Sequence, residues 1–300
     1  MIKYFKKTIN ERDLKELPNF EVGCWINVIN PSLKELKKLA TDYDLDFDLL
    51  EEGIDEYELP RLDIEDDSKY IFIKTISKKK LNTLLIVIAE KFILTITKEE
   101  PDFFKKIVNN QIKITTTQKL KSLIKILSII NDEFEKRTTD IVRKVQRKKT
   151  TTTKLKAADM ENLLEYEDAL NNLVSTYYYK STLYEKLIKK IKFYEDDKDE
   201  IEDLLVDSNQ GLNLCRISLK SISNIRNYYS IIITNNLNKT IKILTIFTIL
   251  ISIPAAISGI YGMNIGLPLQ QDPFAFAYVL GIITLIIVSF IIFLRKKDVL

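Results

Sequence analysis

The sequence predicts an α+β membrane protein, with a cytoplasmic α/β domain built on a mostly antiparallel sheet, a long helical stalk and two C-terminal transmembrane helices. Three observations lead to this expectation. Short β-branched runs fill the first third of the chain, residues 119–210 contain no glycine or proline, and two uncharged apolar runs lie near the end. Such patterns are typical of strands, of long helices and of membrane spans, respectively.

Composition argues against several classes of protein. The 300 residues carry 45 Lys and Arg against 42 Asp and Glu, and a net charge of +3 does not favour binding to nucleic acid through bulk charge. Histidine is absent, which removes the commonest general base and metal ligand. Cys24 and Cys215 lie far apart and predict neither a thiolate metal site nor a disulfide framework. No glycine-rich phosphate loop is present, so we expect no nucleotide cofactor. We also do not expect an enzyme.

The first 115 residues are expected to form the α/β domain. A helix should begin at Pro31, with Asn30 as its N-cap. The expected strands are 24–28, 70–76, 84–88 and 92–97, with a tight turn at 89–91. The sequence therefore places most strands after the helix, in a mostly antiparallel sheet.

A helical region follows, expected as a bundle over 116–196 and a stalk over 197–261. Lys148 to Lys154, which read KKTTTTK, are interpreted as a turn within it. The region is either a regulatory lever or an ordinary antiparallel bundle, and the pattern does not separate the two. A continuous stalk of ~65 residues would be ~97 Å long and would enter the first membrane span directly.

Two uncharged runs, 243–261 and 274–294, predict a membrane hairpin. At ~1.5 Å per residue each can cross ~30 Å of hydrocarbon. Lys and Arg flank both outer ends, including the tail 295–300, whereas the connecting segment 262–273 has none. The positive-inside rule then predicts cytoplasmic termini and an extracellular loop. The first residues have no apolar core and do not resemble a signal peptide.

Small and polar residues share one face of the first span. The residues of this stripe are Asn238, Ile241, Thr245, Thr248, Ser252, Ala255 and Gly259. The stripe is typical either of helix packing or of a water-filled pore formed by several copies of the helix. One helix per subunit cannot enclose a path, so the pore interpretation requires an oligomer.

The first span ends in Gly262, Met263 and Asn264. This tripeptide resembles the signature of the CorA family of magnesium transporters, in which Gly-Met-Asn follows the first of two C-terminal membrane helices. The resemblance continues upstream through residues 238–245, Pro254 and 258–261, and it includes the order of the domains. It implies a homopentameric Mg²⁺ channel with two spans in the cell membrane, in contact with lipid and not with nucleic acid.

The resemblance also implies roles for individual residues. Gly262, Met263 and Asn264 form the selectivity filter at the outer mouth, where a ring of Asn264 amide oxygens accepts hydrogen bonds from a hydrated ion that gives up its water reluctantly. Gly262 permits the turn at the helix end. Asn238 forms a second polar ring at the cytoplasmic end. Ile241 and Leu244 form a hydrophobic constriction that can close by dewetting.

Two features depart from many members of the family. The segment after the motif, 265–272, keeps only Asp272 to attract cations, and Ala255 gives the middle of the pore no polar side chain. Both departures bear on ion choice and affinity.

The same resemblance implies a regulatory Mg²⁺ site between subunits. Glu51 and Glu52 precede Pro60 at the point where the family places an acidic pair, and the helix register places Asp203 and Asp207 opposite them. A hydrated ion would neutralise facing carboxylates and hold two subunits together. The alternative is that these four residues are solvated surface charges.

The sequence leaves three functions open. The first is passive Mg²⁺ influx, for which the inside-negative potential supplies ~4.6 kcal/mol per ~100 mV to a divalent ion. The second is transport of Co²⁺, Ni²⁺ or Zn²⁺ by the same architecture. The third is a membrane-tethered sensor whose hairpin only anchors it.

Overall fold

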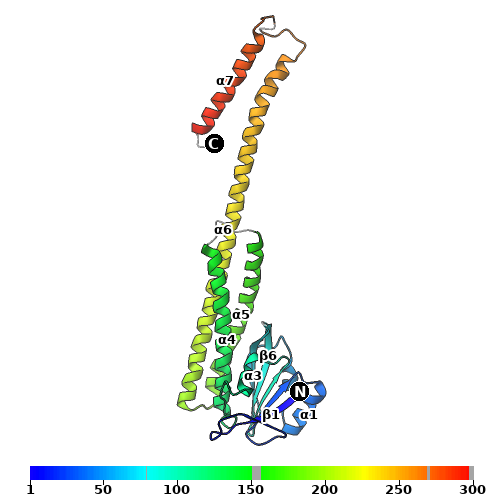
Figure 1. Ribbon diagram of the computed structural model, residues 1–300, viewed down its shortest axis with the longest axis vertical. Coiled ribbons are helices and arrows are strands. Elements are labelled where there is room, and N and C mark those ends of the chain that lie inside the picture. The colour runs from blue at the N-terminus through cyan, green and yellow to red at the C-terminus, as the bar shows by residue number, and fades with distance from the viewer. Residues whose placement is uncertain (79, 151–156, 269–270, 297–300) are drawn as a thin grey trace. The chain divides into compact units, whose positions relative to one another are not determined.

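The computed structural model describes residues 1–78, 80–150, 157–268 and 271–296, and divides the chain into two compact units, Met1–Arg226 and Asn227–Leu300. Within these ranges the first unit holds a seven-stranded sheet and most of the helices (Figure 1). One helix, α6 (Glu195–Tyr261), belongs to both units. The fold class expected from the sequence is confirmed.

The sheet has the strand order β2-β1-β3-β7-β6-β5-β4. Its strands are β1 (Ile2–Lys6), β2 (Lys15–Leu17), β3 (Trp25–Ile29), β4 (Arg61–Glu65), β5 (Ser68–Ser77), β6 (Lys80–Ile88) and β7 (Ile93–Thr97). All neighbouring pairs are antiparallel except β3 with β7. The sheet is therefore mostly antiparallel, as predicted, and a single parallel pair joins its two meanders.

Helices cover both faces of the sheet (Figure 1). Successive residues of β5 and β6 alternate between two apolar clusters, as the period of a strand requires. One cluster contains α1 (Leu33–Tyr43) and α2 (Phe47–Glu52). The other contains α3 (Asp102–Val108) and continues into α4 (Lys119–Thr150). The α/β and helical parts of the first unit thus share a core.

The structure corrects the N-terminus of α1. Asn30 was expected to cap this helix, but Asn30 has a left-handed backbone (φ 47°) and Ser32 is the N-cap. The Ser32 hydroxyl accepts from the Glu35 N–H, and the Glu35 carboxylate accepts from the Ser32 N–H at 2.8 Å. This reciprocal capping box satisfies two backbone N–H groups at the start of the helix, those of Ser32 and Glu35. Pro31 has no backbone N–H group and cannot donate such a hydrogen bond.

The strands expected at 24–28, 70–76, 84–88 and 92–97 are present as β3, β5, β6 and β7. In contrast, β1, β2 and β4 were not expected. They are short strands near the two edges of the sheet, and charged residues interrupt their apolar pattern.

The helical part of the first unit consists of α4, α5 (Ala157–Lys190) and the beginning of α6. Of the turn expected at 148–154, residues 148–150 are instead the last residues of α4, and residues 151–154 lie outside the described residues. The buried face of α6 repeats every three or four residues, from Ile201 and Leu204 to Ile222 and Ile225. This seam packs into the same core as α4 and α5.

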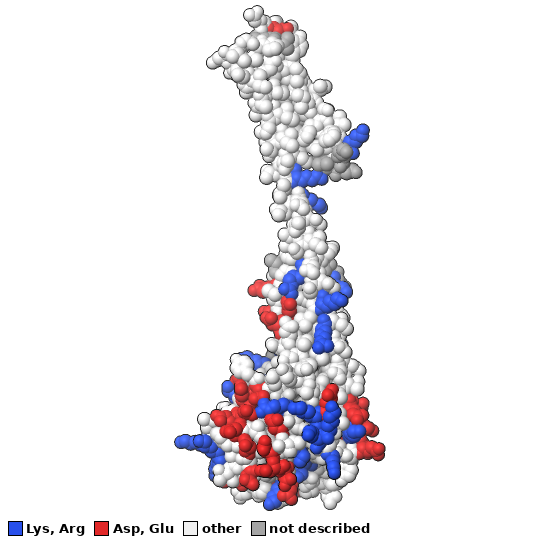
Figure 2. Space-filling model, turned by 180° about the vertical axis from the view of Figure 1, so that it is seen from behind, with Lys and Arg blue, Asp and Glu red and all other residues white. Residues whose placement is uncertain are grey.

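The second unit contains the C-terminal part of α6 and α7 (Ala275–Lys296). Both helices are long and apolar enough to cross a membrane. Pro254 lies inside α6, which membrane helices tolerate. The described charges of this unit are few: Lys239, Lys242, Asp272, Arg295 and Lys296. Figure 2 shows an uncharged surface over most of this unit.

Candidate functional site

The predicted pore stripe lies on a solvent-exposed face of α6. Ile241 is 51 % exposed and Leu244 is 65 % exposed, and Asn238 is exposed beside them. From Asn238 to Gly259 the helix rises about 31 Å, at ~1.5 Å per residue. This rise matches the hydrocarbon thickness of a bilayer. The stripe therefore has the length of a transmembrane path, and all its residues are exposed in the described part of the chain.

The hydroxyl groups of the stripe all donate to their own helix. Thr245 Oγ1 donates to the Ile241 carbonyl at 2.8 Å, Thr248 Oγ1 to the Leu244 carbonyl at 2.9 Å, and Ser252 Oγ to the Thr248 carbonyl at 2.7 Å. Each hydroxyl has one donor and two acceptor lone pairs. With the donors used, this face offers oxygen acceptors, which suit the water shell of a cation.

The helix end at the motif is closed by backbone hydrogen bonds. Gly262 N–H donates to the Ser258 carbonyl at 2.9 Å, and Met263 N–H donates to the Ile260 carbonyl at 3.2 Å. Gly262 does not adopt the left-handed conformation that favours glycine. A Cβ at this position would lie 3.3 Å from the Ser258 oxygen, which is a tight contact. Asn264 follows as an exposed residue.

The one acidic residue of the segment 265–272 caps α7. Asp272 Oδ1 accepts a hydrogen bond from the Phe274 N–H at 2.8 Å, and its backbone carbonyl accepts from the Ala275 N–H at 3.0 Å. The negative charge thus sits at a helix N-terminus, where the helix dipole stabilises it. Asp272 has a structural role in addition to the electrostatic one expected from the sequence.

The four predicted regulatory carboxylates divide into two kinds. Glu51 and Asp203 are exposed and have no ion pair or hydrogen-bond partner for their side chains among the described residues. Glu52, in contrast, is paired with Arg61, and Asp207 Oδ2 accepts from Asn131 Nδ2 at 3.4 Å. Two of the four are therefore already held by their own chain.

Arg61 is the centre of the contacts around Glu52. Its guanidinium also pairs with Glu58, and its Nε donates to Asp63 at 2.5 Å. The group lies over the Phe72 ring, 4.0 Å from the centroid. Burial alone would lower the pKa of Arg61, but the hydrogen bonds to Asp63 and Glu58 outweigh it and raise the pKa. The cation is thus permanently charged and anchored between β4 and α2.

Within the described residues of one chain, no group of three or more His, Cys, Asp or Glu side chains could hold a metal ion. The structure does not bring the α2 pair together with the α6 pair in one such cluster. The expected regulatory site was a contact between subunits, so it stays a prediction.

Sequence reasoning missed a buried cation in the helical part. Lys180 of α5 is 0 % exposed, and burial lowers the pKa of its ammonium group to about 7. Its Nζ donates to Asn131 Oδ1 of α4 at 2.7 Å. Nothing in the run Tyr177 to Lys180 signals a buried charge, because a lysine between polar and aromatic residues is typical of a helix surface.

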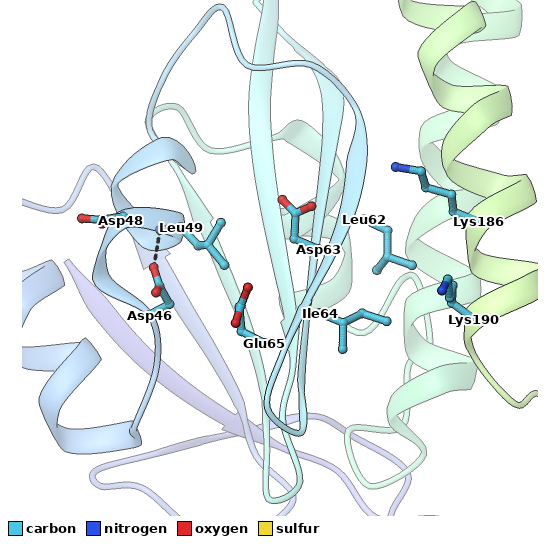
Figure 3. A pocket seen from close by; sticks show the side chains of 9 residues that line it. All are labelled: Asp46, Asp48, Leu49, Leu62, Asp63, Ile64, Glu65, Lys186 and Lys190. Carbon is cyan, nitrogen blue, oxygen red and sulfur yellow. Dashed lines mark hydrogen bonds between the residues drawn. The ribbon is translucent and has the colours of Figure 1, made fainter.

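A groove of about 530 Å³ lies between α2, β4 and α5 (Figure 3). The carboxylates Asp46, Asp48, Asp63 and Glu65 come from one side, and Lys186 and Lys190 come from α5 on the other. Asp46 Oδ1 accepts from the Leu49 N–H at 2.9 Å and caps α2. Charges of both signs line this groove, so it favours neither a simple cation nor a simple anion.

Known proteins resemble the chain over nearly its whole length. The model of a family described as CorA-like Mg²⁺ transporter protein matches residues 20–296. The cobalt/magnesium transport protein CorA of Methanocaldococcus jannaschii is 24 % identical over 300 aligned residues, covering 91 % of this chain and 90 % of that protein. The magnesium transport protein CorA of Campylobacter jejuni is 24 % identical, with 95 % and 93 % covered.

Solved structures share the fold. The complete structure of the CorA magnesium transporter from M. jannaschii superposes with a TM-score of 0.87 at 23 % identity, covering 99 % of this chain and 98 % of that chain. The structure of the full-length CmaX protein gives a TM-score of 0.77 at 17 % identity, with 98 % and 97 % covered. At these identities the likeness shows the fold.

Proposed function

Since this chain belongs to the family of CorA-like Mg²⁺ transporter proteins, it is a membrane transporter of divalent cations, and we propose that it admits Mg²⁺ passively through a pore lined by several copies of α6. The observation that supports this proposal is the exposed stripe that ends at Gly262, Met263 and Asn264. The stripe presents oxygen acceptors, has the length of a bilayer and is exposed in the described part of the chain. A pentamer, inferred from the family resemblance, would enclose it.

The filter of the proposed pore is a ring of Asn264 side chains. A neutral amide oxygen accepts hydrogen bonds from the water shell of Mg²⁺ and does not have to replace it. Met263 carries a thioether, which is a poor ligand for a hard cation, and we assign it a packing role. Gly262 allows the chain to pass close to the Ser258 carbonyl and so fixes where Asn264 stands.

The proposed gate lies at the cytoplasmic end of the stripe. Ile241 and Leu244 would narrow the path to an apolar ring that excludes water, and Asn238 would form the polar ring next to it. Further along, Thr245, Thr248 and Ser252 offer hydroxyl oxygens, while Ala255 and Gly259 widen the path. Closure by dewetting needs no charged gate, which agrees with the charge-free stretch between Lys242 and Asp272.

The membrane potential would drive the ion inward. With both termini in the cytoplasm, a divalent cation gains ~4.6 kcal/mol per ~100 mV when it enters an inside-negative cell. Influx of this kind must stop when the cell is replete. Regulatory Mg²⁺ bound between Glu51 or Glu52 of one subunit and Asp203 or Asp207 of the next would hold the cytoplasmic parts together and keep the gate shut.

Ion flux into liposomes tests the proposal. Purified protein in vesicles loaded with a Mg²⁺ indicator should admit Mg²⁺ faster when the interior is negative, and Asn264→Ala should abolish this flux. Asn236→Ala is the matched control, because it removes the same amide from an exposed position of α6 outside the stripe. Wild-type flux in Asn264→Ala would reject Asn264 as the filter.

Cobalt is a second candidate ion, because the M. jannaschii relative is named a cobalt/magnesium transport protein. The same vesicles with Mg²⁺, Co²⁺, Ni²⁺ and Zn²⁺ outside would rank the four ions. Fastest flux of Co²⁺ at equal concentration would make this protein a cobalt transporter. Flux of none of them would favour the membrane-tethered sensor.

A further inference from the structure

A polar network joins the three long helices of the first unit: Lys180 and Asn131 are buried, and Asp207 lies at the exposed edge of α6. Lys180 Nζ of α5 donates to Asn131 Oδ1 of α4 at 2.7 Å, and Asn131 Nδ2 donates to Asp207 Oδ2 of α6 at 3.4 Å. The Lys180 ammonium also lies 4.8 Å and 4.6 Å from the ring centroids of Phe134 and Tyr177. We call Lys180, Asn131 and Asp207 the Lys180 network.

Stability does not account for this arrangement. Removing an ammonium group from water is costly, and well-packed apolar side chains of similar volume often stabilise a protein as much or more. Asn131 is the one hydrogen-bond partner of Lys180 Nζ among the described residues. The Asn131 side-chain amide therefore lies between the ammonium group and the Asp207 carboxylate, which attracts it electrostatically. The best-attested use of such buried polar groups is to fix the register of packed helices.

In the seam of α6 such a device acts together with the buried hydrogen bond between Ser181 Oγ of α5 and Ser208 Oγ of α6, at 3.1 Å. The buried positions of the seam repeat with helical spacing through Ile201, Leu204, Ser208 and Leu212, and a repeating seam can be matched again after a shift of one turn, ~5.4 Å. The polar atoms of the network occur at one level of the seam only. At the same level Gly211 passes so close to Tyr177 that a Cβ would overlap its ring.

We propose that the Lys180 network fixes the rotation and axial register of α6 on α4 and α5, and thereby sets the resting position of the helix that lines the pore. Lys180 and Asn131 are positioning residues in this account. They do not touch the transported ion. The consequence for gating rests on the proposed function, whereas the fixing of register does not.

Distances between spin labels test the register directly in the full-length protein. Tyr178→Cys on α5 and Val206→Cys on α6 provide exposed sites, and the native cysteines Cys24 and Cys215 are buried. Labelled chains are diluted with unlabelled ones, so that each label pair lies within one subunit. In the double variant Lys180→Met/Asn131→Leu, the single distance distribution of the parent should broaden or split, while the melting temperature stays equal or rises.

Transport should change with the register. The internal Mg²⁺ concentration that halves the flux should shift by about tenfold in the double variant, which is an ordinary size for a coupling between two sites. Tyr177→Phe is the matched control: it removes the buried hydrogen bond to Thr138 between α4 and α5, keeps the ring, and leaves the network intact. It should leave both readouts at their parent values.

A parent-like distance distribution together with parent-like shut-off in the double variant would overturn the proposal. If that variant does not fold, Lys180→Gln replaces it, and unchanged distances there would have the same meaning. Broadened distances in a protein whose parent carries no divalent flux would uphold the network and reject the proposed function. Changed flux with unchanged distances would reject the network and leave the proposed function standing.

Discussion

In Met1–Arg226 the large apolar side chains pack into two clusters on the two faces of the sheet, whereas in Asn227–Leu300 side chains of the same kind point outward. Phe104 is fully buried in the first unit, and Leu244 is 65 % exposed in the second. The first unit can satisfy its apolar surface alone. Under the proposed function, lipid and further copies of the chain cover the second unit, so its substitutions should affect transport far more than the stability of one subunit.

Phe104→Ala should have the largest effect on stability. Phe104 packs edge-on against Trp25 with the ring centroids 5.2 Å apart, and truncating such a side chain in a core costs about 3–5 kcal/mol. Trp25 is the only tryptophan, so its fluorescence reports unfolding of the first unit of the detergent-solubilised protein. Leu244→Ala, measured in the same way, should change the unfolding free energy by less than about 0.5 kcal/mol. A loss above 2 kcal/mol in Leu244→Ala would break the comparison.

Leu244→Gly should have the largest effect on regulation. Without its side chain the proposed constriction becomes wider and wetter, so flux should persist at internal Mg²⁺ concentrations that close the parent channel. Ile241→Gly should do the same to a similar degree. Ile243→Gly, at a neighbouring exposed position outside the stripe, controls for the loss of helix propensity. If Leu244→Gly and Ile241→Gly both close normally, the constriction lies elsewhere, and Ser252 is the next residue to test.

The pH dependence of stability should be visible in the first unit only. Burial raises the pKa of Glu133 to about 7, and its Oε2 has no hydrogen-bond partner among the described residues. Between pH 4.5 and about 7 the folded state therefore binds more protons than the unfolded state. Stability from this group is fully present below pH 4.5 and decreases as pH rises to about 7.

Glu133→Gln removes this dependence. At pH 8 it should raise the unfolding free energy by about 1–2 kcal/mol, allowing for solvent screening of a half-buried group. Asp132→Asn, on the exposed side of the same helix, is the control. Parallel pH profiles of unfolding in Glu133→Gln and the parent would contradict the buried acid.

Apolar periodicity was enough to predict the central strands and both membrane helices. The runs at 70–76 and 84–88 are buried on both faces, so they read as mostly apolar sequence, broken in the first run only by Lys74 and Thr75. Edge strands do not read in this way. In β4, apolar Leu62 and Ile64 alternate with charged residues, and this period of two was overlooked. The seven-stranded order, with β3 beside β7, depends on contacts far apart in sequence.

Residues of the candidate site could be proposed from the sequence where a local motif marks them, and their roles stay predictions. Groups that depend on tertiary contacts could not be proposed in this way. Gly262 to Asn264 and the stripe before them can be read from the sequence, because both lie on one helix and its end. Lys180 could not be found, because its burial depends on Asn131 and Asp207, 49 residues before it and 27 residues after it along the chain. The pairing of Glu52 with Arg61 is likewise a product of the fold.

The smallest expected effect on stability is that of the α1 N-cap, for which Ser32→Ala is compared with Asn30→Gly. Ser32→Ala should destabilise the first unit by about 1 kcal/mol, because the α1 N-terminus loses the hydroxyl that accepts from Glu35 N–H. Asn30→Gly should be neutral or slightly stabilising, since its left-handed backbone suits glycine.

In the second unit, Thr245→Val removes a hydroxyl that bonds only its own helix, and it should leave stability unchanged while reducing Mg²⁺ flux. Trp25 fluorescence and vesicle flux measure the two effects. Equal losses of stability in Ser32→Ala and Thr245→Val would mean that the second unit contributes to the fold of the first.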